Sequence, residues 1–158
     1  MSSELVATII TESDRNVCVD RLLLLEKALY TQSELPSQVA AEILPENQAN
    51  IIAEALKKPG VNYRKTILQF IKELKQLEVV NITMAEEYPR SLLITFHQKL
   101  TSILKNPVVI KIQIRSDLLA GAIIEFQGRF IDASLSKRIS EYFDANRAKI
   151  MKEITKGL

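Results

Sequence analysis

Apolar residues recur at helical spacing along the first 77 residues of the chain. Prolines at positions 36 and 45 stand where helices begin, and Lys57-Lys58-Pro59-Gly60 is a basic last turn followed by helix-breaking residues. The pattern predicts helices over 14–31, 36–44, 46–57 and 62–77, with a short one before residue 11. The clearest stripe, on 62–77, consists of Ile67, Leu68, Phe70, Ile71, Leu74 and Leu77.

The helix predicted over 14–31 is apolar nearly all round. Its apolar positions are Val17, Cys18, Val19, Leu22 to Leu25, Ala28 and Leu29. This pattern indicates either a central helix or a helix with one face covered by something outside the chain. Cys18 is the single cysteine, so it forms no internal disulfide, and we expect it to be a small core residue.

After Glu78 the pattern changes to β-branched and alternating residues. Strands are predicted over 79–84, 108–114, 122–126 and 129–131, the last two joined by a tight turn at Gln127-Gly128, and a helix begins near Pro89. We expect one buried face on the strand 108–114. The closing helix has its apolar side on Leu135, Ile139, Tyr142, Phe143, Ile150 and Ile154, a spacing interpreted as that of a helix packed on a sheet.

This order of elements predicts an α+β fold in two domains. An all-helical N-terminal bundle spans 1–77, and a small αβ domain with a short mixed sheet and a long closing helix spans 78–158. The 21 basic and 19 acidic residues are interspersed and give a net charge of +2, which is typical of a solvated surface. No apolar run is long enough to span a bilayer.

Candidate catalytic residues are few. Asp132 and Ser134 stand at a strand-to-helix junction, where either side chain is expected to cap the helix, because no second His or Cys is present to activate the serine. His97, the only histidine, lacks further ligands at metal-binding spacing, so a structural role is expected. Neither a GxGxxG nor a GxxxxGK[ST] motif occurs. The sequence therefore predicts no catalytic residue, no cofactor and no metal site.

The closing helix is basic, with residues that include Lys137, Arg138 and Arg147, but acidic residues such as Glu141 interrupt that charge. We expect a solvated face or a protein contact. The alternative, a small regulatory or nucleic-acid-binding αβ module that uses this helix, stays open; several phosphate contacts would give it a steep salt dependence.

The segment 116–138, SDLLAGAIIEFQGRFIDASLSKR, resembles the C-terminal signature of the delta subunit of F-type ATP synthases, called the oligomycin-sensitivity-conferring protein in mitochondria. The similarity extends over about 79–143. Arg115 and the Gln127-Gly128 turn depart from the family's usual residues, and the N-terminal helical part is shorter than the family's bundle. The resemblance implies structural roles for Leu118, Ala120, Gly121, Gly128, Ile131, Asp132, Ser134 and Arg138.

The resemblance also implies a function. Such a subunit is a non-catalytic peripheral-stalk (stator) connector, which links the N-terminal helix of an alpha subunit in the catalytic head to the b-type stalk subunits. Members bind no nucleic acid and reach the membrane only through the complex, here expected on the cytoplasmic face of a bacterial plasma membrane. Candidate contacts with the alpha-subunit helix are Leu22, Leu25, Leu29, Ile67, Phe70 and Ile71.

Overall fold

The computed structural model describes residues 2–31 and 35–156, which form two compact units. Unit 1 contains the chain up to Val79 together with Arg90–Lys111, and unit 2 contains Val80–Pro89 together with the chain from Ile112 onward. The division passes through two strands of the sheet. An N-terminal helical part followed by a mixed sheet with helices confirms the predicted α+β class. An independently folding domain boundary at 77/78 remains a prediction.

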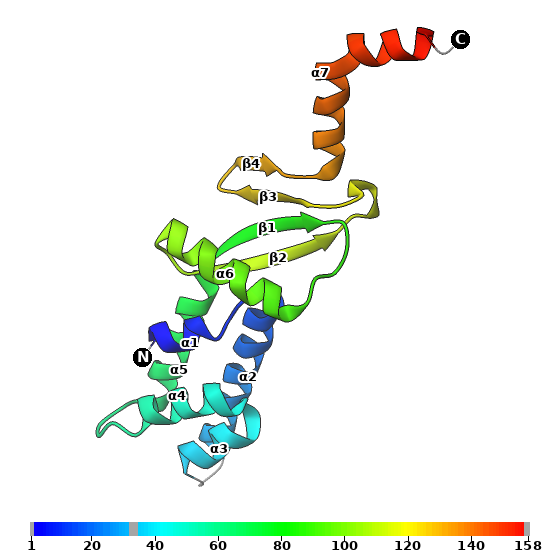
Figure 1. Ribbon diagram of the computed structural model, residues 1–158. Helices are drawn as coiled ribbons and strands as arrows, with labels where there is room; N and C mark the ends of the chain where they lie inside the picture. The colour runs from blue at the N-terminus through cyan, green and yellow to red at the C-terminus, as the bar shows by residue number, and fades with distance from the viewer. Residues whose placement is uncertain (1, 32–34, 157–158) are drawn as a thin grey trace. The chain divides into compact units, whose positions relative to one another are not determined.

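Among the described residues, five helices open unit 1 (Figure 1), and side-chain caps begin two of them, whereas prolines stand at the starts of the third and fourth. At the start of the second helix, the Thr11 N–H donates to Asp14 Oδ2 and the Asp14 N–H donates to Thr11 Oγ1, a reciprocal cap that begins the helix earlier than residue 14. Asn62 Oδ1 accepts from the Lys65 N–H and caps the fifth. The helices are α1 (Ser2–Ala7), α2 (Glu12–Thr31), α3 (Pro36–Ile43), α4 (Glu46–Leu56) and α5 (Tyr63–Lys75).

The core of unit 1 is apolar and closed. Leu22 and Leu25 from α2, Ile52 from α4, and Ile67 and Leu74 from α5 are fully buried within one cluster. The other side of α2 is exposed, with Val17 at 46% and Leu24 at 56% of full accessibility. Thus α2 is not buried all round: one face enters the core, and apolar side chains on the other face meet solvent.

Long-range contacts hold α6 (Arg90–Leu104) and the first part of β2 (Val108–Ile114) in unit 1. Arg90 pairs with Asp14 at 3.2 Å, and the Ile110 N–H donates to the Ile10 carbonyl at 2.9 Å. His97 Nε2 lies 2.8 Å from the Val108 carbonyl oxygen and joins α6 to the start of the strand. The Ile10–Ile110 bond joins the segment before α2 to β2, and the Arg90–Asp14 pair joins α6 to α2.

The four strands form one sheet in the order β2-β1-β3-β4. β1 pairs antiparallel with β3, and β3 with β4, whereas the arrows of β1 and β2 point the same way in Figure 1. The prediction of one buried face on β2 was wrong: Val109 is fully buried, and Ile114 is 47% exposed. Val109 enters the core of unit 1, which accounts for its burial. The other strands are β1 (Glu78–Met84), β3 (Ala122–Phe126) and β4 (Arg129–Asp132).

Candidate functional site

The segment that carries the family resemblance is a structural junction in unit 2. The Ala133 N–H donates to the Ala122 carbonyl and the Leu135 N–H to the Ala120 carbonyl, both at 2.9 Å, so two stretches of backbone are joined directly. Gly121 lies between these bonds with φ +87°, and a Cβ there would come within 2.5 Å of the Ala133 carbonyl oxygen. Only glycine fits this position without displacement.

Asp132 and Ser134 serve the same junction. Asp132 Oδ1 accepts from the Ser134 N–H at 2.9 Å, and Ser134 Oγ accepts from the Lys137 N–H in the first turn of α7 (Leu135–Lys156) at 3.3 Å. Hydrogen bonding from Ser134, first from its side chain and then from its backbone, holds the pKa of Asp132 below its ordinary value. The Ser134 hydroxyl thus caps the helix. Because Ser134 is buried, this hydroxyl is not accessible as a nucleophile.

The remaining signature residues divide between interior and surface. Leu118 is buried, whereas Ile131 is 60% exposed and Arg138 lies exposed on α7. Gly128 follows Gln127 in the two-residue turn between β3 and β4, and φ is positive at both residues. Such a turn matches the twist of the strands that it joins.

The surroundings of His97 and Cys18 indicate structural roles for both residues. His97 contacts a backbone carbonyl, as described above, and Cys18 is 1% exposed in the core. Burial raises the pKa of the Cys18 thiol to about 11, so the reactive thiolate is scarce at neutral pH. Within residues 2–31 and 35–156, no cluster of three His, Cys, Asp or Glu residues is arranged to hold a metal ion. In the same ranges no helix has the length and apolar character needed to cross a bilayer.

An exposed apolar stripe runs along the first half of α7. It consists of Leu135, Ile139, Tyr142 and Phe143, each between 39% and 63% exposed, and we call it the α7 stripe. The expectation that these residues pack on a sheet was wrong, because α7 continues away from β4 after the junction (Figure 1). The side chains of Ile150 and Ile154 lie outside the described residues.

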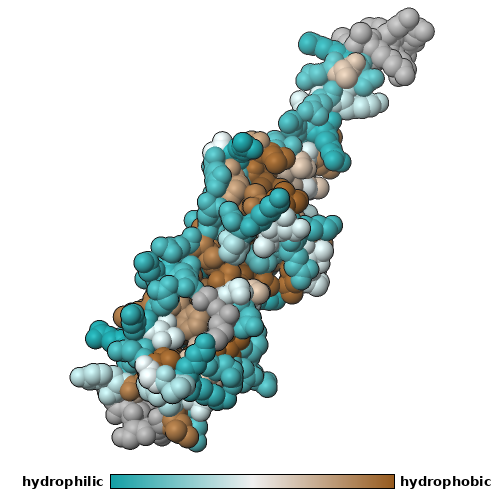
Figure 2. Space-filling view, turned by 90° about the vertical axis from the view of Figure 1, so that its left-hand side faces the viewer, coloured by the Kyte–Doolittle hydropathy of each residue, from teal (hydrophilic) through white to brown (hydrophobic). Residues whose placement is uncertain are grey.

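Strand β4 also exposes apolar side chains, one on each face of the sheet. Phe130 is 64% and Ile131 60% exposed, although neighbouring residues of a strand point to opposite faces. Figure 2 shows hydrophobic residues at the surface of the sheet part of unit 2, below the base of α7. Exposed apolar side chains that gather on a surface are typical of a protein contact.

The residues expected to contact an alpha-subunit helix lie mostly in the interior. Leu22, Leu25, Ile67, Phe70 and Ile71 are at most 6% exposed, and Leu29 is only partly buried. In the structure they form the core of unit 1, so a partner helix would meet neighbouring surface instead. Helical spacing identifies an apolar stripe, but it does not say whether the stripe faces the protein's own core or a partner.

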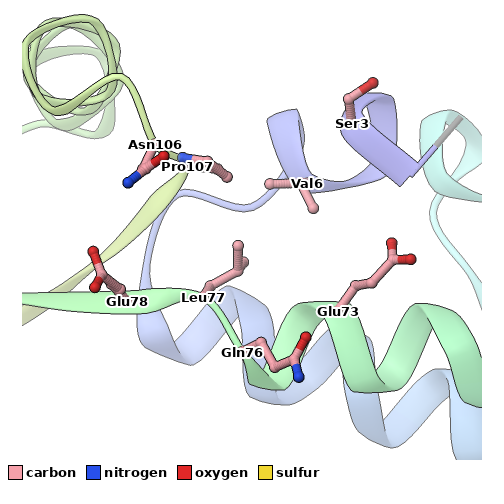
Figure 3. Close-up of a pocket in the computed structure, with 8 residues that line it drawn as sticks. All are labelled: Ser3, Val6, Glu73, Gln76, Leu77, Glu78, Asn106 and Pro107. Carbon is pink, nitrogen blue, oxygen red and sulfur yellow. The ribbon is translucent and has the colours of Figure 1, made fainter.

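Unit 1 offers a hollow of about 580 Å³ between α1 and the end of α5. Val6 of α1 and Leu77 point toward one another across it, and Glu73 extends from α5 toward α1 (Figure 3). Pro107 and Glu78, which has a second carboxylate, also line the hollow. The hollow thus combines apolar contacts with negative charge, and sequence reasoning missed it because its lining comes from three separate segments.

The comparisons with known proteins agree with this picture. The protein-family model described as ATP synthase delta (OSCP) subunit matches residues 61–145, just over half of the chain. A search of curated proteins found no match. The matched region includes α5, the sheet and the whole glycine junction, where the signature residues were found. The chain belongs to the ATP synthase delta (OSCP) subunit family, whose members are structural, non-catalytic subunits of the peripheral stalk.

Proposed function

We propose that this chain connects the catalytic head of a proton-translocating F-type ATP synthase to its b-type stalk subunits. The observation that carries the proposal is the α7 stripe, a row of large apolar side chains that meet solvent in unit 2. A connector transmits force through packed surfaces, so it needs such contact areas and no reactive groups. Holding the head against rotation would let the rotor's torque be converted into ATP synthesis.

The stalk contact is assigned to the α7 stripe. Leu135, Ile139 and Tyr142 are spaced by four and three residues, so they lie on one side of the helix and suit a partner helix packed along it. Phe143 lies beside Tyr142 with a ring-centroid distance of 6.3 Å and an edge-to-face angle of 80°. Aromatic anchors of this kind often dominate interface energies.

The head contact is assigned to the hollow between α1 and α5. Its apolar side chains, Val6 and Leu77, would contact the apolar side of an alpha-subunit N-terminal helix. The Glu73 carboxylate would favour basic residues on the flank of that helix. The complex would hold the chain peripherally, on the cytoplasmic face of a bacterial plasma membrane.

The head assignment is tested with the full chain and a peptide of an alpha-subunit N-terminus from the same genome. We expect the peptide to gain helical circular dichroism on binding, and Val6→Asp to weaken binding by more than about tenfold, since a carboxylate would replace an apolar contact. Ile103→Asp, at a position 75% exposed and outside the hollow, is the control for the added charge, and the melting temperature of Val6→Asp is compared with that of the unchanged chain because Val6 packs against the core. Absence of both helix ordering and measurable affinity would reject the assignment.

A further inference from the structure

The backbone of unit 2 is strained at an exposed leucine. Leu119 directly follows a short 3-10 helix, η1 (Ser116–Leu118), and has a φ of 61° and a ψ of −53°. The Ala120 N–H donates to the Leu118 carbonyl at 2.6 Å, so these three residues form a γ-turn of the rare kind in which the central φ is positive. A residue with a Cβ adopts this conformation at a cost, which glycine largely avoids.

The residues on both sides hold this γ-turn in place. Leu118 is 5% exposed, so its side chain is fixed in the interior. On the other side, the Ala120 carbonyl accepts from the Leu135 N–H, and Gly121 lies against the Ala133 carbonyl oxygen. The backbone is therefore fixed before and after Leu119, which is the condition under which an unfavourable conformation persists in a folded protein.

The side chain at the centre of the turn does not serve the core. Leu119 is 67% exposed, so burial of its apolar surface does not offset the strain of its backbone. Glycine at this position would relieve the strain and would cost little packing. Residues held in strained conformations concentrate at binding and catalytic sites, and an exposed apolar side chain in such a position suits a protein contact.

The neighbours of Leu119 indicate which contact this is. The hydrogen bond between Ala120 and Leu135 holds the turn against the first residue of the α7 stripe, and Figure 1 shows the loop before β3 beside the base of α7. Leu135 is itself 41% exposed. The ion pair of Arg115 and Asp117, both more than half exposed, precedes the turn and would form part of a polar rim. A helix packed along the α7 stripe would thus reach Leu119 at the base of α7.

We propose that Leu119 is an anchor of the stalk contact, held beside the α7 stripe by the strained γ-turn. The inference rests on the proposed stalk function and adds to it a contact residue from outside α7. The occupant is the apolar side of the same b-type helix that packs on the stripe. Because strain and contact reside in one residue, removing the side chain should change stability and binding in opposite directions.

The experiment measures the melting temperature of the full chain and its affinity for the C-terminal segment of a b-type subunit from the same genome. Leu119→Gly should raise the melting temperature by about 2 °C, because it relieves the strained backbone. The same variant should weaken binding by at least about fivefold, because the apolar anchor is lost. Leu119→Met retains an apolar side chain of similar size and should bind within about twofold of the unchanged chain.

Leu35 provides the matched control. It is 64% exposed and lies in unit 1, where its φ of −65° is an ordinary one. Leu35→Gly should not raise the melting temperature, because glycine relieves no strain there and adds conformational freedom to the unfolded chain. It should bind the stalk segment as the unchanged chain does.

The possible failures are distinguishable. A melting temperature of Leu119→Gly at or below that of the unchanged chain would refute the strain at Leu119. Full affinity in Leu119→Gly, together with weakened binding in a variant with Ile139→Asp and Phe143→Asp, would exclude Leu119 from the contact and leave the α7 stripe as the stalk surface. No measurable affinity of the unchanged chain would refute the stalk function, and the anchor with it.

Discussion

Ile67 in unit 1 and Ile139 in unit 2 both lie on the apolar stripe of an amphipathic helix, but Ile67 is fully buried and Ile139 is 39% exposed. The helices of unit 1 pack against one another and close a core around Ile67. In unit 2, α7 leaves the strands after one junction, and its stripe has no such cover among the described residues. The same local pattern therefore builds a core in one unit and an exposed apolar stripe in the other.

The largest expected effect is on the free energy of unfolding, when each of the two isoleucines is replaced by alanine. Ile67→Ala should lower the free energy of unfolding by about 2 to 5 kcal/mol, because it leaves a cavity in a closed core. Ile139→Ala should cost less than about 1 kcal/mol, since its side chain already meets water. Urea denaturation of both variants measures the difference. Equal losses would mean that α7 is packed in the isolated protein.

The second effect concerns the junction that holds the base of α7. Gly121→Val should destabilise unit 2 more than Gly128→Val by over about 1 kcal/mol, because both glycines have positive φ but only Gly121 is crowded by the Ala133 carbonyl. No atom lies within 4 Å of a Cβ at Gly128. Thermal unfolding compares the two variants. Matching melting temperatures would refute the proposed role of close approach at Gly121.

Sequence reasoning predicted the local parts of this fold better than the long-range ones. The Gln127-Gly128 turn and the cap at Ser134 depend on neighbouring residues, so the sequence alone indicates them. The burial of Val109 depends on helices more than thirty residues away, which alternation along the strand does not reveal. Prediction of the candidate contact surfaces is limited in the same way, because a stripe of apolar residues in the sequence does not identify what covers it.

The third prediction uses pH to test the junction. The folded-state pKa of Asp132 is lowered, so its carboxylate stabilises the fold above the ordinary pKa of 3.8, and this contribution is lost as the pH falls through the lower folded value. The melting temperature should therefore fall on acidification below about pH 4. Asp132→Asn should reduce this dependence, because the amide retains an acceptor for the Ser134 N–H but has no charge.

Asp144→Asn on the exposed surface of α7 is the control for that experiment. The pKa of Asp117 is also lowered, first by a side-chain hydrogen bond from Arg115. Asp117 therefore also stabilises the fold above its ordinary pKa, and we expect it to leave some pH dependence of the melting temperature in the Asp132→Asn variant. Equal pH dependence in the Asp132→Asn variant and the unchanged chain would contradict a stabilising carboxylate at the junction.

The smallest expected effect lies in the turn between β3 and β4. Gln127 has φ +49°, a conformation that Asn adopts at lower cost than Gln. Gln127→Asn should raise the free energy of unfolding by about 0.5 kcal/mol. Thermal unfolding measures the gain, and a lower melting temperature would show that the Gln127 side chain makes a contact worth more than the relief of strain.

The central claim is that unit 2 exposes the α7 stripe for a stalk subunit. The most direct measurement is the affinity of the full chain for the C-terminal segment of a b-type subunit from the same genome. We predict that Ile139→Asp together with Phe143→Asp weakens binding by more than about tenfold while lowering the melting temperature less than Ile67→Ala does, and that Ile103→Asp binds normally. Undiminished affinity in the double variant would contradict the claim.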